Sequence, residues 1–393
     1  MDDDDAVDYD APVDDGPVDD ELLDDPTRLI AADRPGLLRS LATAGAQVRE
    51  LAALSAEAGV ARLAAGAAPR SLVLVADPPA AATVDLLSAL ADRRDGCPVF
   101  ALPLEPAAPG APALPNWVGA ADLVVVAGLT RSRESELALL ADGAARRGAA
   151  LLGVGRAGGS LEERCSWARA PYVAVPLERA DGVASWALAT PVLRLAGELG
   201  LLGPESGDAL DELAAALDRM AELCRPDGES FLNPGKLLAQ QLAGALPMVL
   251  ADSAAMGMVA RRFASALARL AGVPAAVAVL PGDAAEAAAY LTGPFAPGPA
   301  ERDIFRDRVD ETGPVLRLVV VREQQAPEGP APTVLRELVR QAELTGLVSG
   351  ELVAEESGRL PRMGALIALG EFAAAYLRLA SGRGGTDLER YRA

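Results

Sequence analysis

One seven-residue stretch combines hydroxyl and guanidinium side chains at a spacing that suits anion binding. It reads GLTRSRE over residues 128–134 and lies between an apolar run and a helical pattern. Its four central residues would stand where the amides and the dipole at the start of a helix attract an oxyanion, and guanidinium groups bind phosphate or carboxylate well. These residues are Thr130, Arg131, Ser132 and Arg133. A second interpretation is that a hydroxyl only caps the helix and the arginines are solvated.

The single lysine of the chain, Lys236, is another candidate for an anion contact, because every other positive side chain is an arginine. It follows Asn233 and Pro234, and Asn at the N-cap with Pro at the first helical position makes a good helix start. The pattern therefore leaves two roles open for Lys236: an anion contact, or an ordinary charge near the start of a helix.

Composition argues against several kinds of site and partner. The chain has no histidine, so no transition-metal site is expected. We also expect no cofactor. The three widely spaced cysteines fit reduced structural thiols. The net charge of −20 repels nucleic acid and anionic lipid. No apolar run approaches the roughly 20 residues that cross a bilayer, and the acidic start does not resemble a secretory signal. We expect a cytoplasmic protein without nucleic-acid or membrane partners.

The order of elements predicts an α/β fold. Short apolar runs alternate with amphipathic segments, which is typical of parallel sheets with helices on both faces. The first unit has such runs at residues 72–76, 123–127, 151–154 and 172–175, and the second has them at residues 248–251, 275–280 and 315–321. Two units of similar build indicate an internal duplication.

Predicted boundaries divide the chain into six parts. Residues 1–25 carry paired aspartates and little hydrophobicity, so we expect a disordered acidic tail, with docking on a basic partner surface as the alternative. A helical segment, a first subdomain, a helical connector, a second subdomain and a short tail follow. They cover residues 26–68, 69–195, 196–232, 233–382 and 383–393.

Three stretches resemble the bacterial bifunctional phosphoglucose/phosphomannose isomerase family, whose members have the double sugar-isomerase (SIS) fold. Residues 122–153 resemble the family's phosphate-binding strand, loop and helix. The second stretch begins NPGKLLAQQLAGALPMVL at Asn233, and the third reads RLPRMGALIALGEFAAAYLRLASG over residues 359–382. The resemblance implies two flavodoxin-like SIS subdomains, a homodimer, and a role in carbohydrate metabolism with a sugar phosphate or another small anion as ligand.

The same resemblance implies that the usual catalytic groups are missing. Pro78 and Pro79 stand where the family has a Gly-Gly-Ser phosphate loop, and proline has no N–H to donate. Arg269 stands at the position of the catalytic glutamate and stays protonated, so it cannot accept a proton. The family's ring-opening histidine has no counterpart, and its Pro-Arg pair has none near residues 181–182.

Three functions therefore stay open. The first is a pseudoenzyme that binds a phosphorylated sugar or similar anion without isomerase turnover. The second is an active glucose-6-phosphate/mannose-6-phosphate isomerase with relocated catalytic groups. Glu286 is its first candidate base, and Glu134 and Asp283 are weaker candidates. Isolated carboxylates on polar faces are, however, usually solvated. The third is a non-catalytic dimeric scaffold without a sugar ligand.

Overall fold

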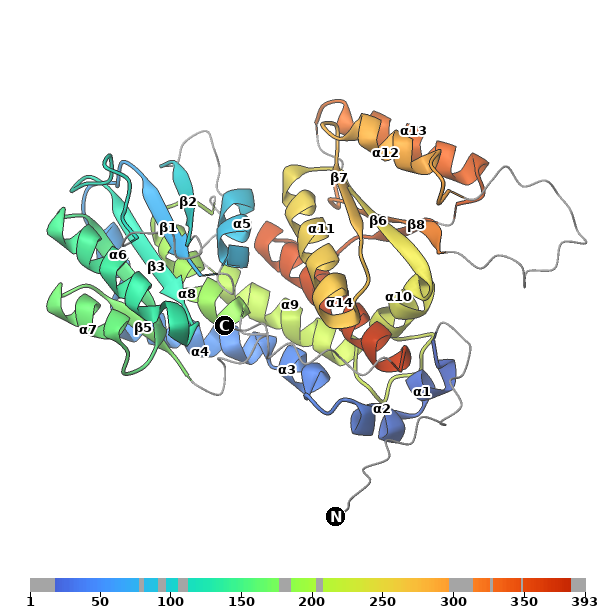
Figure 1. Cartoon of the computed structure of the whole chain (residues 1–393), viewed down its shortest axis with the longest axis horizontal. Helices are drawn as coiled ribbons and strands as arrows, with labels where there is room; N and C mark the ends of the chain where they lie inside the picture. The colour runs from blue at the N-terminus through green and yellow to red at the C-terminus, as the bar shows by residue number, and fades with distance from the viewer. Residues whose placement is uncertain are drawn as a thin grey trace, which may run out of the picture.

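The computed structural model contains two parallel sheets with helices on both faces (Figure 1). The fold class predicted from the sequence, two α/β subdomains with parallel sheets, is confirmed. The structure describes residues 18–77, 81–90, 97–104, 112–176, 185–202, 208–296, 314–325, 328–347 and 349–382.

The first subdomain is a five-stranded parallel sheet in the order β2-β1-β3-β4-β5. Its strands are β1 (Leu72–Ala76), β2 (Val99–Pro103), β3 (Leu123–Gly128), β4 (Ala150–Arg156) and β5 (Tyr172–Val175). Every residue of β1 and β3 is buried, which explains their continuous apolar sequence. One face carries α6 (Glu134–Arg146) and α7 (Ser160–Trp167). The other carries α4 (Ala44–Glu57), α5 (Ala81–Leu90), the short helix η1 (Val60–Ala64) and α8 (Ser185–Glu198).

The second subdomain is a four-stranded parallel sheet in the order β7-β6-β8-β9. Its strands are β6 (Ala245–Ala251), β7 (Ala276–Val279), β8 (Val315–Val321) and β9 (Ser349–Leu352). Helices α12 (Ala284–Leu291) and α13 (Ala331–Leu344) cover one face. Helices α10 (Pro234–Leu242), α11 (Ala254–Ala266) and α14 (Arg359–Ala380) cover the other.

The closing helix α14 is a core helix. It packs against α10, α11 and α9 (Ala209–Leu223). Among the described residues it is the one helix long and apolar enough to cross a membrane, but 94% of its most apolar window is buried inside the protein. Its hydrophobicity is therefore explained by packing within the fold.

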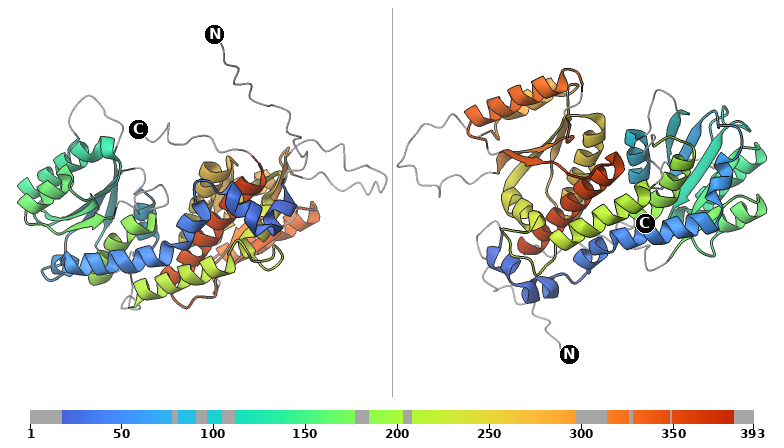
Figure 2. Two further views of the ribbon diagram at one scale, coloured as in Figure 1. Left: turned by 90° about the horizontal axis from the view of Figure 1, so that it is seen from below. Right: turned by 180° about the vertical axis from the view of Figure 1, so that it is seen from behind.

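Helices join the two subdomains side by side. Helix α9 lies between α4 and α14, and α3 (Leu37–Ala42) also contacts α9 and α14 (Figures 1 and 2). Helix α5 of the first subdomain contacts α11 of the second. The subdomains thus meet along an interface of helices, some of which cover the first sheet and some the second.

The acidic N-terminal segment becomes ordered earlier than the sequence predicted. Residues 1–17 lie outside the described residues, but α1 (Asp20–Asp24) and α2 (Pro26–Ala32) are helices. Leu23 and Leu29 are completely buried, and the Asp19 amide donates a hydrogen bond to the Ala380 carbonyl at 2.9 Å. The predicted disordered tail therefore does not extend to residue 25, because two leucines anchor its last turns against the second subdomain.

Candidate functional site

The loop after β3 is where the sequence predicted an anion site. Strand β3 ends at Gly128, and a single 3₁₀ turn, η3 (Arg131–Arg133), leads into α6. Parallel α/β sheets bind ligands outside the carboxyl ends of their strands, where backbone amides point away from the sheet. The architecture therefore places Thr130, Arg131, Ser132 and Arg133 at the expected edge.

The backbone amides of this loop already hold a carboxylate of the protein. Asp77 follows the last residue of β1 and is completely buried. Its Oδ2 accepts hydrogen bonds from the amides of Leu129 at 2.9 Å and Thr130 at 2.8 Å. Gly128 permits this approach, because a Cβ atom there would lie 2.8 Å from the Asp77 carboxyl carbon. The donors that would face a phosphate thus bind an internal anion.

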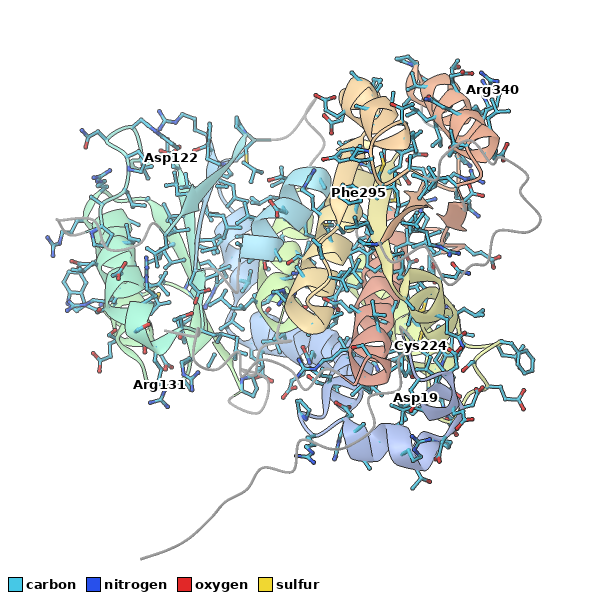
Figure 3. The ribbon with its side chains drawn as sticks, turned by 45° about the vertical axis from the view of Figure 1, so that its right-hand side comes forward. Asp19, Asp122, Arg131, Cys224, Phe295 and Arg340 are labelled. Atoms are coloured by element: carbon cyan, nitrogen blue, oxygen red, sulfur yellow. The ribbon has the colours of Figure 1, made fainter. Side chains whose placement is uncertain are left out.

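The four predicted side chains lie together but differ in exposure. Arg131 and Ser132 are exposed, and Figure 3 shows Arg131 pointing outward at the end of the sheet opposite Asp122. Arg133 is engaged: its Nη2 donates to the Leu104 carbonyl at 3.1 Å and pairs with Glu136 at 3.0 Å. Neither η3 nor α6 begins with a side-chain cap, so the capping interpretation of the hydroxyls is not what the structure shows.

A small hollow adjoins this loop. Glu134, Arg156 and Tyr172 line it together with the loop backbone, and it leaves no room for a water molecule. The Tyr172 hydroxyl donates to the Arg156 carbonyl at 2.6 Å, and burial raises the pKa of this phenol. Glu134 therefore lines a hollow that is too small to hold a substrate.

Lys236 lies elsewhere and serves a different set of partners. Its side chain is 1% exposed, and Nζ donates to the carbonyls of Leu23 at 2.5 Å, Gly228 at 2.7 Å and Pro226 at 2.8 Å. An ammonium has three hydrogens, so all of its donors are used. Burial lowers the pKa of Lys236. Lys236 therefore links α1 to the loop before α10. It does not lie at the loop that follows β3 (residues 129–133, called the Thr130 loop below).

The other positions singled out by the sequence are also scattered. Helix α11 is followed by a π-helical turn, Leu267–Ala271. Arg269 is exposed on this turn, and its Nε donates to Ser265 Oγ at 3.2 Å. Glu286 is exposed in the first turn of α12, and Asp283 accepts from the Val279 amide at 2.8 Å. Pro78 and Pro79 lie outside the described residues.

Asp252 is a titratable residue that the sequence interpretation did not select. It follows β6, is 3% exposed, and both of its carboxyl oxygens accept from the Glu323 amide, at 3.1 and 3.2 Å. Burial raises the pKa of Asp252 to about 6, and the Glu323 charge adds to the rise. A signal was present: LVAD ends at Asp77 and VLAD ends at Asp252, each at the end of a buried strand.

Comparison with known proteins agrees with the architecture. Residues 231–389 match the family described as the bacterial phospho-glucose isomerase C-terminal SIS domain. No curated protein sequence matches the chain. Among solved structures, a hypothetical protein from Thermus thermophilus is 15% identical with a TM-score of 0.61, and the match covers 95% of this chain and 93% of that one.

Two further solved structures share the fold. A candidate phosphosugar isomerase from Silicibacter pomeroyi is 17% identical with a TM-score of 0.55, covering 88% of this chain and 98% of that one. The C-terminal domain of glucosamine-fructose-6-phosphate aminotransferase from Francisella tularensis is 10% identical with a TM-score of 0.54, covering 88% and 96%. At these identities the structures show the fold alone. The match of residues 231–389 shows an SIS domain like that of the bacterial phospho-glucose isomerases in the second subdomain, and the solved structures show that the whole chain shares the fold.

Proposed function

We propose that this protein is a non-catalytic SIS protein of carbohydrate metabolism, which lacks isomerase turnover. The observation that carries the proposal is the buried Asp77 carboxylate on the amides of Leu129 and Thr130. A phosphate placed on the same amides would meet a negative charge that is already hydrogen-bonded there. Two anions cannot share these donors without a large electrostatic cost.

The proton-transfer groups support the same conclusion. Aldose–ketose isomerisation needs a base that moves a proton between two carbons, and an acid that helps open the ring. Arg269 cannot accept a proton, and the chain has no histidine. Glu286 is exposed on α12 in the second subdomain, whereas the Thr130 loop belongs to the first. Loss of several members of a catalytic unit argues against ordinary turnover.

We also propose that the protein recognises a phosphorylated sugar or another small anion. The ligand would bind beside the backbone amides of Leu129 and Thr130 (the amide cradle), not on them. Arg131 and Ser132 are the exposed members of the loop, and a guanidinium binds phosphate in bidentate fashion. The likeness to a candidate phosphosugar isomerase supports this ligand class. A homodimer, expected from the family resemblance, and a cytoplasmic location, expected from the composition, complete the proposal. Sedimentation equilibrium tests the dimer.

The decisive experiment is a 31P NMR time course of purified, isomerase-free protein with fructose 6-phosphate, with the Tm measured on the same sample. We expect no glucose or mannose 6-phosphate. A higher Tm with ligand, weakened in Arg131→Ala and unchanged in the exposed control Arg164→Ala, supports recognition at the rim. Product that disappears in Glu286→Gln would instead identify an active isomerase with a relocated base. Neither product nor a Tm change would favour the scaffold function.

A further inference from the structure

A small cavity lies where the two subdomains meet. Its wall is formed by Thr83 and Leu86 of α5, Trp186 of α8, and Met258 and Arg262 of α11. The cavity volume is about 20 Å³, enough for one water-sized atom or group. It is separate from the Thr130 loop, whose residues line a different hollow.

Two polar side chains in this wall are buried and unsatisfied. Thr83 is 2% exposed and Trp186 is 4% exposed. Within the described residues, neither Thr83 Oγ1 nor Trp186 Nε1 has a hydrogen-bond partner. A buried donor left unpaired is costly, and native proteins seldom tolerate two in one place. An acceptor atom inside the cavity would remove both penalties at once.

The electrostatics of the wall favour a negative acceptor. Trp186 Nε1–H can only donate, and a threonine hydroxyl can donate as well. Thr83 is the third residue of α5 and Trp186 the second residue of α8, so both lie at the positive ends of helix dipoles. Arg262 contributes a guanidinium to the wall, and its charge is balanced by Glu371, with which it pairs at 2.7 Å. None of the described residues that line the cavity is acidic.

We propose that this cavity binds one acceptor atom of a small anion, either a chloride ion or a single oxygen of a carboxylate or phosphate. Thr83 Oγ1–H and Trp186 Nε1–H are the donors, and both stand at the positive ends of helix dipoles. Because α5 and α8 belong to the first subdomain and α11 to the second, the bound anion joins the two subdomains. This site goes beyond the proposed function, since it uses none of the residues of the Thr130 loop.

The test observes the tryptophan indole groups directly. The chain has three tryptophans, so a 15N-labelled sample gives three indole N–H signals, and Trp186→Phe identifies the signal of Trp186. Chloride, acetate and phosphate are titrated separately at constant ionic strength, with gluconate as the bulky balancing anion. We expect a saturable shift of the Trp186 signal, while the signals of the more exposed Trp117 and Trp167 stay unchanged. The anion that produces the shift identifies which source supplies the acceptor.

A matched pair of variants keeps the proposal falsifiable. Thr83→Val keeps the shape and removes the hydroxyl, and should raise the Kd for the anion about tenfold. Thr83→Ser keeps the hydroxyl and should restore the affinity. The ligand-free Thr83→Val protein should also melt higher than the natural one, because a buried unpaired hydroxyl has been removed. A Trp186 signal that ignores all three anions, or shifts equally in both variants, would overturn the proposal and leave a cavity for water only.

Discussion

Asp77 and Asp252 occupy equivalent places in the two sheets. Each follows the last residue of the first strand of its sheet in chain order. That strand lies second from the sheet edge: β1 between β2 and β3, and β6 between β7 and β8. Ala76 pairs with Ala127, and Ala251 pairs with Val321. In both sheets the carboxylate accepts from backbone amides just beyond the neighbouring strand. A carboxylate thus lies at the end of the same strand in both halves, as an internal duplication predicts.

Replacing Asp77 with Ala should both destabilise the protein and open the amide cradle. Loss of two charge-assisted hydrogen bonds, with two amides left unpaired, is expected to lower the free energy of unfolding by about 3 kcal/mol. Inorganic phosphate should then raise the Tm of the variant by more than it raises the Tm of the natural protein. Phosphate at about 100 times its Kd would add roughly 2.7 kcal/mol to the free energy of unfolding of the variant.

Thermal unfolding with and without phosphate measures both effects. Asp85→Ala is the control, because Asp85 is an exposed aspartate on the neighbouring helix α5. Equal stabilisation of the natural protein and the Asp77 variant by phosphate would mean that the anion binds elsewhere.

Asp252→Asn should stabilise the protein at neutral pH. Burial raises the pKa of this carboxyl from 3.8 to about 6, so the folded state keeps a proton that the unfolded state has already lost. The free energy of unfolding therefore falls as the pH rises through this window, by roughly 3 kcal/mol in total. Asparagine keeps an oxygen for the Glu323 amide and carries no charge, so it escapes this loss.

Urea unfolding at pH 4.5 and pH 7.5 tests the sign. The variant should be more stable than the natural protein at pH 7.5, and the difference should shrink at pH 4.5. Asp85→Asn should show neither effect. A variant that is less stable at both pH values would show that the charged form of Asp252 is needed.

Local patterns predicted what is local, and failed where distant segments meet. The continuous apolar runs of β1 and β3 predicted buried parallel strands, and the GLTRSRE stretch predicted the loop position. The edge strands β2 and β9 were missed because VFALP ends in proline and SGEL has no β-branched or aromatic residue. Asp77 meets its amides 52 and 53 positions away, and Lys236 meets the Leu23 carbonyl 213 positions away. Composition also favoured disorder for the acidic segment. Residues 20–24 nevertheless form a helix, because Leu23 is buried against the second subdomain.

Lys236→Met should act on stability and not on ligand binding. Methionine approximates the shape of the lysine but leaves the carbonyls of Leu23, Pro226 and Gly228 without their donor, so we expect a loss of about 3–5 kcal/mol. Urea unfolding measures the loss. Arg225→Met, at an exposed position in the adjacent loop, should change stability far less than Lys236→Met, because exposed ion pairs contribute little.

The burial of Lys236 allows a second readout. Because the chain has a single lysine, an amine-directed acetylating reagent followed by peptide mass spectrometry reports on that side chain alone. The folded protein should leave Lys236 unmodified, and modification should appear only with denaturant. Rapid modification of the folded protein would show that the ammonium is accessible and available for a ligand.

Arg269→Glu restores the side-chain type that the family resemblance places at the catalytic base, and it should still yield no isomerase. Arg269 is exposed on the π-helical turn, so the substitution should change stability by less than about 1 kcal/mol and give a well-folded test protein. A carboxylate there can accept a proton, but Asp77 still holds the amides of the Thr130 loop, and no histidine supplies the acid. The 31P NMR time course with fructose 6-phosphate should therefore match that of Arg261→Glu, an exposed control on α11. Turnover in Arg269→Glu alone would show that only the base had been lost and that the closed loop admits a phosphorylated sugar after all.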